Sequence, residues 1–377
     1  MATTHVFIVD ATTFSYHLQY MFAGTGAKDD FIDFNNLSTS TLDPRKELKL
    51  AGMMADCARI RANDYVIFYL QRNMSSGIKE GKFYGVFKVR QAPFFLDNND
   101  ANQFLNNELR KSLTFRILIK PHKVYQKGVT EWEALDEIKN INSPNQMLWS
   151  LIYRKLKGNR GNTMITLYES ERLRLLISAK NNHQYLTSHN YDFDSNNELI
   201  ITSNNSNIYT GRTETVNLLP RLIEKYSNSK QFEAHLQEYI LQNIENISVF
   251  QNLNIDWIGN EVSCGVGMQR IDILLSVDTD PKKIIPIELK SIKVKTEIIQ
   301  QVQRYINWLE QYYVPNIPSL IEPMIIVRKT NNKNSSKFNI FIQNLRMLNT
   351  ANSCYVRYVE FDIDTINSSI LFTEHSY

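Results

Sequence analysis

The first part of the chain alternates short apolar runs with polar turns, a pattern typical of β-strands. The runs are enriched in β-branched and aromatic residues and span residues 5–9, 65–70, 83–89 and 115–120. Between the first two, residues 42–61 place apolar side chains at helical spacing, with Pro44 near the expected start of the helix. Residues 146–156 and 165–178 predict two further helical pieces. The pattern therefore indicates a small sheet or barrel accompanied by helices.

The last part of the chain predicts a helix, then strands, then another helix and strand. Apolar residues mark one face of the expected first helix, and polar turn residues separate the two apolar runs of an expected hairpin. In chain order, these elements are a helix at 231–245, strands at 270–277 and 283–292, a helix at 296–313 and a strand at 322–328. This order is typical of an α/β core.

The stretch between these two parts is rich in Asn, Ser and Thr, which favour turns over regular hydrogen-bonded ladders. The run ELIIT and its flanking residues can still pair as a hairpin. We therefore predict an N-terminal domain at 1–180, a connector at 181–228 with a hairpin in it, and a C-terminal domain at 229–377. The length of 377 residues also suits two domains.

Composition narrows the class of protein. The 42 Lys and Arg residues nearly balance the 39 Asp and Glu residues, so a nucleic-acid-binding surface has to be local. The cysteines Cys57, Cys264 and Cys354 lie far apart and form no CxxC pair, which argues against a zinc ribbon or a disulfide scaffold. No leader pattern and no run of roughly 18 apolar residues is present. We expect a cytoplasmic protein without a membrane partner.

Candidate catalytic residues lie on the two strands of the expected C-terminal hairpin. Because strand side chains alternate, Glu288 and Lys290 are expected on one face of their strand. Asp272 stands between Ile271 and Ile273, and we expect it to point away from the face that these isoleucines share. If the polar faces of the two strands coincide, two carboxylates meet beside one lysine.

This combination is suited to metal-dependent phosphodiester hydrolysis. Mg²⁺ binds one or two carboxylates and completes its shell with water and phosphate oxygens, so Asp272 and Glu288 are candidate metal ligands, and we expect Mn²⁺ to substitute. Lys290 would position the attacking water or help to deprotonate it, with no covalent intermediate. Each of these residues alone is more often a solvated side chain or part of a salt bridge. The prediction depends on their combination on adjacent strands.

The stretches QRIDILL, PIELK and QQVQRYINWL resemble the PD-(D/E)XK nuclease superfamily, and specifically the NucS or EndoMS family of archaeal and actinobacterial mismatch endonucleases. The resemblance covers about residues 230–312 and implies a restriction-endonuclease-like α/β domain. A Pro-Asp pair before the first acid is replaced here by Arg270-Ile271. The resemblance implies five active-site residues, which are the metal ligands Asp272 and Glu288, the catalytic Lys290, the accessory Gln301 and the helix acid Glu233.

The N-terminal part resembles the EVE and YTH domains of the PUA-like superfamily. The resemblance is carried by RIRANDYVIFYLQ followed by GKFYGVFKVRQAPFF, covers about residues 5–178, and implies a PUA-like β-barrel. Such domains hold a flipped, modified base between aromatic rings, where stacking offsets the cost of extrusion. The candidate pocket residues are Tyr20, Phe22, Trp132 and Trp149, although an aromatic residue of a β-rich domain more often belongs to the core.

A basic loop in the same part of the chain is a candidate contact for DNA phosphates. Four cations lie within seven residues that also include Gly158, so both the backbone and the charges can approach phosphate oxygens. A solvated basic turn is the alternative interpretation. The four residues are Arg154, Lys155, Lys157 and Arg160.

Together these features predict a chain of α/β and α+β class that acts as a Mg²⁺-dependent endodeoxyribonuclease. We expect modification-dependent restriction, in which the N-terminal domain recognises a modified base in double-stranded DNA and the C-terminal domain cuts. Two alternatives remain, a NucS-like endonuclease for mismatched or branched DNA and a non-catalytic nucleic-acid binding protein. Double-strand cleavage with one active site per chain favours a homodimer.

Overall fold

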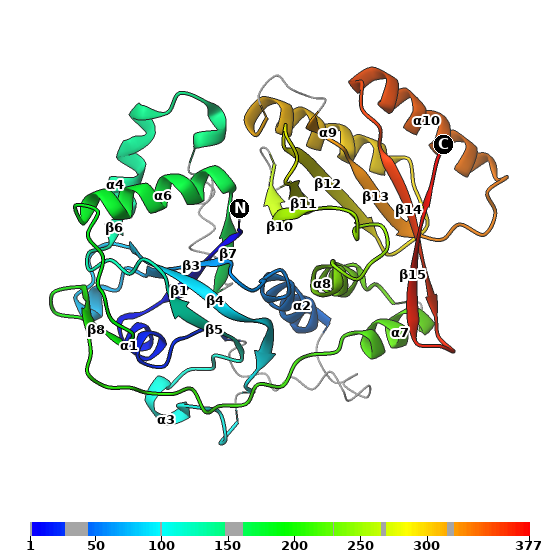
Figure 1. Ribbon diagram of the computed structural model, residues 1–377. Coiled ribbons are helices and arrows are strands. Elements are labelled where there is room, and N and C mark those ends of the chain that lie inside the picture. Colours follow the sequence, from blue (N-terminus) through cyan, green and yellow to red (C-terminus); the bar gives the residue numbers. More distant parts are fainter. Residues whose placement is uncertain are drawn as a thin grey trace.

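The computed structural model describes residues 2–26, 44–98, 100–147, 161–228, 230–264, 269–314 and 320–377. Within these ranges the chain is a mixed α/β protein with three sheets (Figure 1). No helix in the described ranges is both long enough and apolar enough to cross a membrane.

The N-terminal half is built around a sheet with the strand order β2-β5-β4-β3-β1-β7, and β6 pairs with β4. Only β1 and β3 pair in parallel. The strands are β1 (Thr4–Val9), β2 (Phe22–Thr25), β3 (Tyr65–Leu70), β4 (Lys82–Leu96), β5 (Phe115–Pro121), β6 (Val129–Thr130) and β7 (Asn162–Ile165). This arrangement confirms the four predicted strands at 5–9, 65–70, 83–89 and 115–120.

The helices of this half include the two predicted at 42–61 and 165–178, and most of the piece predicted at 146–156 lies outside the described residues. Pro44 starts α2, as expected. The α-helices are α1 (Ala11–Gln19), α2 (Pro44–Ala58), α3 (Asn106–Leu109), α4 (Glu131–Asp136) and α6 (Leu167–Lys180), and the 3-10 turns are η1 (Met74–Ser76), η2 (Glu137–Asn140) and η3 (Pro144–Gln146).

The predicted β-barrel is wrong, because the described strands form an open sheet with β2 and β7 at its edges. The β7 edge is covered by the C-terminal half of the chain instead of closing onto β2. The indole N–H of Trp257 donates a hydrogen bond of 3.1 Å to the carbonyl of Ile165 in β7. Tertiary contact with the second half therefore satisfies a carbonyl at the end of this edge strand.

The C-terminal half has a six-stranded sheet in the order β10-β11-β12-β13-β14-β15, in which β12, β13 and β14 run in parallel. The predicted hairpin of β11 and β12 is confirmed. The strands are β10 (Ile255–Ser263), β11 (Arg270–Val277), β12 (Lys283–Lys290), β13 (Met324–Arg328), β14 (Arg357–Asp364) and β15 (Ser369–His375).

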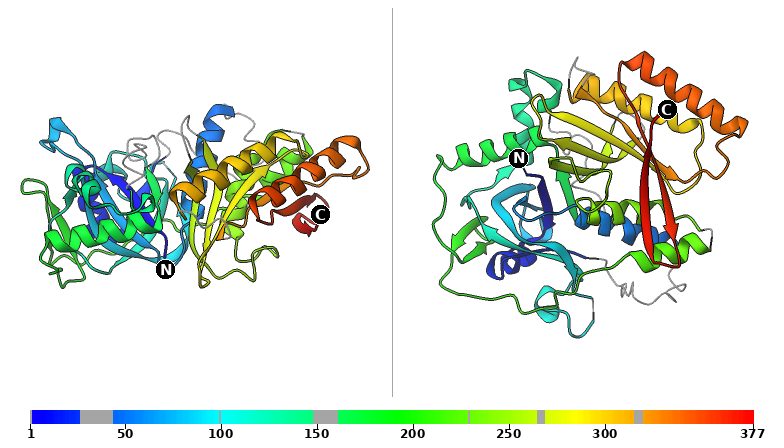
Figure 2. Two further views of the ribbon diagram at one scale, coloured as in Figure 1. Left: turned by 90° about the horizontal axis from the view of Figure 1, so that it is seen from above. Right: turned by 45° about the vertical axis from the view of Figure 1, so that its right-hand side comes forward.

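Helices cover both faces of this second sheet. The helix α8 (Glu233–Asn243) packs on one face, and α9 (Glu297–Tyr312) and α10 (Ser336–Asn352) pack on the other (Figures 1 and 2). Both predicted helices of this half, at 231–245 and 296–313, are confirmed as α8 and α9. The sheet is therefore buried on both faces, which fits the nearly continuous apolar sequence of its central strands.

The connector holds the hairpin that its sequence predicted, formed by β8 (Tyr191–Asp194) and β9 (Leu199–Thr202), and then a helix, α7 (Leu219–Ser227). The hairpin packs against α1, where the rings of Phe14 and Phe193 lie 4.8 Å apart between centroids. The connector thus adds side chains to the core of the N-terminal half.

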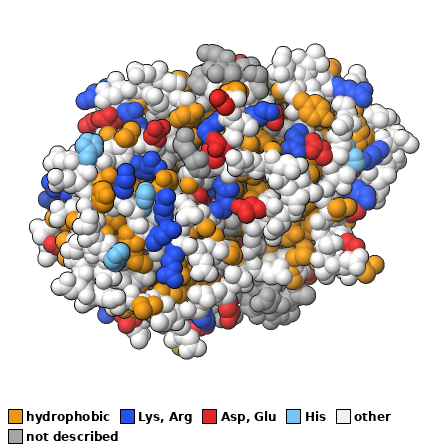
Figure 3. Space-filling view, viewed as in Figure 1, with side chains coloured by type: hydrophobic (Ala, Val, Ile, Leu, Met, Phe, Trp, Pro, Cys, Tyr) orange, Lys and Arg blue, Asp and Glu red, His pale blue; other side chains and the backbone are white. Residues whose placement is uncertain are grey.

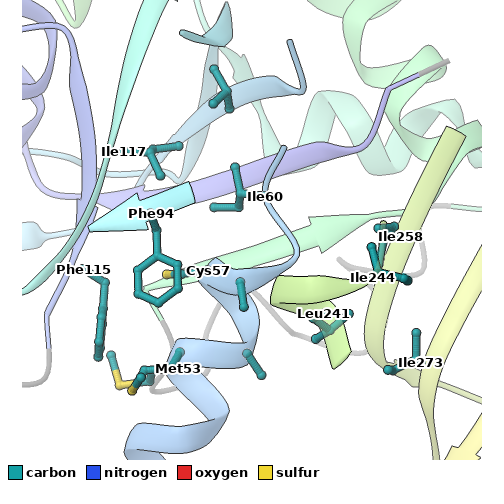
Figure 4. Close-up of a cluster of buried hydrophobic side chains, with 14 of the residues drawn as sticks. Met53, Cys57, Ile60, Phe94, Phe115, Ile117, Leu241, Ile244, Ile258 and Ile273 are labelled. Atoms are coloured by element: carbon teal, nitrogen blue, oxygen red, sulfur yellow. The ribbon is translucent and has the colours of Figure 1, made fainter. Parts of the chain in front are cut away.

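The two halves share one hydrophobic core where α2 packs against α8. Figure 4 shows Met53 and Cys57 of α2 in this cluster, together with Leu241 of α8 and Ile273 of β11. A fragment that ended before α8 would therefore expose this face of α2 to water. The fold holds the N-terminal sheet and the C-terminal sheet in one packed unit.

Candidate active site

Two of the predicted catalytic side chains meet at the end of β12. Ile287 and Leu289 point into the core beneath α8, and Glu288 and Lys290 point to the other side, which confirms the predicted alternation. The ammonium of Lys290 lies 2.6 Å from Oε1 of Glu288, whose side chain is almost fully buried. A buried carboxylate and a half-buried ammonium therefore form the floor of the site.

Asp272 also lies at this site, but the local geometry that places it there differs from the prediction. Ile271 and Ile273 belong to two different core clusters, so the expectation that they share one face is wrong. The pairing of β11 with β12 begins only at Ile273, and before it the carboxylate of Asp272 accepts a hydrogen bond of 2.8 Å from the backbone N–H of Leu289. The side chain of Asp272 thus lies between the ends of the two strands.

Glu233 is the first residue of α8 and completes the cluster. Its Oε1 lies 3.2 Å from the ammonium of Lys290, and its Oε2 accepts a hydrogen bond of 3.4 Å from the backbone N–H of Ser291. The helix is tied to the site one turn later, where the amide of Gln237 donates to the carbonyl of Asp272 at 2.6 Å. A carboxylate at a helix N-terminus is also favoured by the helix dipole.

The α9 side chain that contacts the site is Tyr305, which was not predicted from the sequence. Its hydroxyl lies 2.5 Å from Oε2 of Glu288 and 2.8 Å from the carbonyl of Arg270, and it can donate to one of them at a time. No hydrogen bond from Gln301 to the cluster is found within the described ranges, so its accessory role stays a prediction. Tyr305 follows Gln301 by four residues and so lies on the same helix face, which was an available signal.

The active-site cluster has more acidic than basic side chains, because Asp272, Glu288 and Glu233 surround the ammonium of Lys290. Burial raises the pKa of Asp272 well above its usual range, and the neighbouring carboxylate of Glu288 raises it further. Burial works against the ammonium of Lys290, but Glu288 and Asp272 outweigh it and raise the pKa of this lysine. Burial and Glu288 also raise the pKa of Tyr305, whose hydroxyl therefore stays protonated. The two carboxylates therefore favour the charged form of Lys290.

The donor set fits a hard divalent cation that keeps part of its water shell. Asp272 and Glu288 offer two carboxylates, which is the number that Mg²⁺ takes when water and phosphate oxygens complete its shell. Within the described ranges, no group of three or more His, Cys, Asp or Glu side chains is arranged to hold a metal. The buried Oε1 of Glu288 lies 2.6 Å from the ammonium of Lys290, so a cation held by Glu288 would share this carboxylate with the lysine.

The three residues proposed for the aromatic pocket that the structure describes, Tyr20, Phe22 and Trp132, do not line one open pocket. Phe22 is fully buried beneath the guanidinium of Arg116, 4.9 Å from its ring centroid, so its assignment to an open pocket is wrong. Tyr20 packs edge-on against Phe104 in the same cluster. Trp132 lies on α4 with 65% of its surface exposed, and Trp149 lies outside the described residues. The guanidinium of Arg116, which forms a buried ion pair with Asp97, also lies over the rings of Phe104 and Tyr209.

The predicted DNA-binding loop also lies outside the described residues. Its four cations, Arg154, Lys155, Lys157 and Arg160, stay a prediction.

A separate cleft of about 830 Å³ lies between the two halves of the chain. It is lined by Ile60 and Arg61 just after α2, by Thr215 and by Tyr239 and Gln242 of α8. The cleft is not lined by the active-site residues Glu233, Asp272, Glu288, Lys290 and Tyr305. The cleft and the candidate active site are therefore different places.

No protein-family model and no curated protein matches the sequence. Among solved structures, the chain is similar to the EndoMS-dsDNA2 complex at 17% identity and a TM-score of 0.24, over 34% of this chain and 44% of that one. It is similar to a hypothetical protein from Leishmania major at 12% identity and a TM-score of 0.28, over 48% of this chain and 97% of that one. It is also similar to the human THYN1 protein in complex with 5-methylcytosine-containing DNA, at 10% identity and a TM-score of 0.26, over 48% of this chain and 98% of that one. At these TM-scores the chemistry of the site has to be argued from its own side chains.

Proposed function

We propose that this protein is a Mg²⁺-dependent endonuclease that hydrolyses phosphodiester bonds of double-stranded DNA. The observation that carries the proposal is the convergence of Asp272, Glu288 and Lys290 at the ends of two adjacent strands, with Glu233 beside them. Two carboxylates next to an ammonium group are suited to holding a cation and a phosphate together.

Each side chain has a distinct part in the proposed reaction. Asp272 and Glu288 would hold Mg²⁺, or Mn²⁺ in its place, and the cation would neutralise charge on the scissile phosphate. Lys290 donates hydrogen bonds to a phosphate oxygen and stabilises the charge that grows there in the transition state. Tyr305 holds Glu288 in place through its 2.5 Å hydrogen bond.

Glu233 is the proposed proton acceptor. Its side chain is 41% exposed, and it lies beside Lys290 rather than between the two proposed metal ligands. Water attacks phosphorus, its proton passes to Glu233, the bond from phosphorus to the leaving sugar oxygen breaks, and that oxygen takes a proton from solvent. The sequence left open whether Lys290 positions the attacking water or helps to deprotonate it, and this proposal passes the proton to Glu233.

The proposal includes modification-dependent restriction, with recognition by the N-terminal half and cutting by the C-terminal half. Repair of mismatched or branched DNA is the alternative activity for the same site. Because Asp272, Glu288 and Lys290 are all present, restriction and repair are both favoured over non-catalytic binding of nucleic acid.

A cleavage assay with matched substrates tests the proposal. We expect the full chain with Mg²⁺ to nick or linearise plasmid DNA, to prefer a plasmid with modified bases over an otherwise identical unmodified one, and to lose activity in EDTA. Mismatched and branched duplexes are included as further substrates. Cleavage confined to those duplexes would assign the repair activity, and DNA binding without cleavage of any substrate would contradict the proposal.

Replacing Tyr305 with Phe tests how Glu288 is positioned. The variant removes the hydroxyl that donates to Glu288, and an unsatisfied buried group costs about 1–3 kcal/mol. We expect roughly a tenfold loss of kcat, at the low end of what losing a single positioning contact costs, with KM for DNA changed little. Tyr312→Phe, at the end of the same helix, is the matched control. Equal kcat values for Tyr305→Phe and wild type would show that Tyr305 has no positioning role.

A further inference from the structure

Five basic side chains gather on one face of the N-terminal half, and we call them the basic patch. Figure 3 shows Lys and Arg side chains forming a stripe on this half, over α6, β4 and β5. All five side chains are exposed or half-buried. They are Lys88 and Arg90 of β4, Lys120 of β5, Lys123 just after β5, and Arg174 of α6.

Two members of the basic patch, Lys88 and Arg174, lie over the ring of Tyr65. The guanidinium of Arg174 lies 4.5 Å from the ring centroid of Tyr65, and the ammonium of Lys88 lies 5.2 Å from it. The ring of His122 lies 5.5 Å from the same ring. Cation–π contacts of this kind hold the charged groups over the tyrosine face and reduce the entropy that a ligand would have to remove.

The positive charge of the basic patch is not neutralised by acidic side chains. Within the described ranges, none of its five members takes part in an ion pair, whereas other cations of this half do, such as Lys82 with Glu198 and Arg172 with Glu137. Burial lowers the pKa of His122, and Lys88, Lys123, Arg174 and Lys120 lower it further by repulsion. These cations are therefore close enough to oppose a further positive charge, and a polyanion would relieve that repulsion.

The position of the basic patch relates it to the candidate active site. Tyr65 donates a backbone hydrogen bond of 2.9 Å to the carbonyl of Thr3. The hydroxyl of Thr3 in turn accepts a hydrogen bond of 3.0 Å from the backbone N–H of Ile258. Ile258 lies in β10, the strand that pairs with β11 and its Asp272. The backbone of Tyr65 is thus linked through Thr3 to the half of the chain that carries the candidate active site.

We infer that the basic patch is a binding surface for the phosphate backbone of duplex DNA. The inference rests on the proposed function and deepens it, because it names the surface that holds the substrate beside the cutting half. Contacts to phosphates supply affinity and position without sequence information. The basic patch is also separate from the loop at 154–160, so it offers phosphate contacts on ordered strands and a helix.

A salt titration of DNA binding tests the inference with the full chain. A labelled 30-base-pair duplex is titrated by fluorescence anisotropy in EDTA, so that cleavage does not interfere, at several salt concentrations. The triple variant Lys88→Gln, Lys120→Gln and Arg174→Gln removes three phosphate contacts and should lower the slope of log Kd against log salt by about 2.7, since each contact contributes about 0.9. We expect an affinity loss of roughly tenfold or more at low salt.

A matched control separates a local effect from loss of net charge. The triple variant Lys139→Gln, Lys337→Gln and Arg346→Gln removes two lysines and one arginine that are exposed elsewhere, and its slope should equal that of the wild type. Circular dichroism and thermal unfolding check that both variants fold. In NMR titrations, DNA should raise the pKa of His122 in the wild type, because phosphates offset the surrounding cations.

Two outcomes would overturn the inference, and a third would count against the proposed function instead. Equal slopes for the two triple variants would show that the basic patch makes no particular contact with DNA. Binding of the wild type to phosphatidylserine vesicles but not to the duplex would assign the surface to a membrane. A wild type that binds DNA through the basic patch yet cuts no substrate in Mg²⁺ would contradict the proposed function alone, so the two failures are distinguishable.

Discussion

Replacing Asp272 with Asn is expected to lower the single-turnover rate of Mg²⁺-dependent DNA cleavage by about 10³-fold or more, because it removes a charged ligand from the proposed cation site. Lys290→Met should have an effect of similar size, because it removes the ammonium that stabilises the transition state. DNA affinity in EDTA should stay within about threefold of the wild type for both variants, since neither residue belongs to the basic patch.

The control for these variants lies on the same strand. Lys283 begins β12 and pairs with Glu322, far along the strand from Lys290, so Lys283→Met should cut at the wild-type rate. Mg²⁺ should also raise the Tm of the wild type and not that of Asp272→Asn, which gives a readout independent of cleavage. Full cleavage by Asp272→Asn would refute the active-site assignment.

Replacing Glu47 with Gln is expected to give the largest loss of stability. This buried carboxylate of α2 lies 2.8 Å from Arg221 and 3.0 Å from Lys225 of α7, and 3.1 Å from His235 of α8. Removing its charge leaves the buried ammonium of Lys225 without its carboxylate partner and Arg221 with only Glu224, and breaking a buried pair in this way costs about 3–5 kcal/mol. For a chain of this size we expect the Tm to fall by roughly 10 °C.

Acid titration gives a second test of Glu47. Burial acts to raise the pKa of Glu47, but hydrogen bonds from His235, Lys225 and Arg221 outweigh it and hold the pKa well below its usual range. A carboxyl group with a depressed folded-state pKa stabilises the protein above its unfolded-state pKa of about 4.3, and this contribution is lost as the pH falls further. The stability difference between wild type and Glu47→Gln should therefore be full at neutral pH and shrink below about pH 4.

A surface pair provides the control for Glu47. Glu322 pairs with Lys283 where both side chains are partly exposed, so Glu322→Gln should cost about 1 kcal/mol or less. Equal destabilisation by Glu322→Gln and Glu47→Gln in urea unfolding would show that the buried cluster does not join α2 to α7 and α8 as the structure indicates.

The sequence by itself determined the elements whose apolar periodicity is strong. Alternation along β12 was enough to place Glu288 and Lys290 on one face, because the pleated backbone of a strand points every second side chain the same way. The hairpin of β11 with β12, the helices α8 and α9 and four strands of the N-terminal half were predicted for the same local reason. Weaker or fully apolar stretches, such as β10 and β15, were not predicted, since short runs do not distinguish strand from helix.

Only the tertiary structure decided how distant segments meet. The position of Asp272 depends on where β11 stops pairing with β12, and the contact of Tyr305 with Glu288 depends on how α9 packs across the sheet. Trp257 of the C-terminal half bonds to β7 at the edge of the open N-terminal sheet, and the basic patch joins side chains of β4, β5 and α6 that are far apart in sequence. Local patterns specify which face of an element is polar, but the energy that selects its neighbour comes from burial between segments, which periodicity along one segment does not contain.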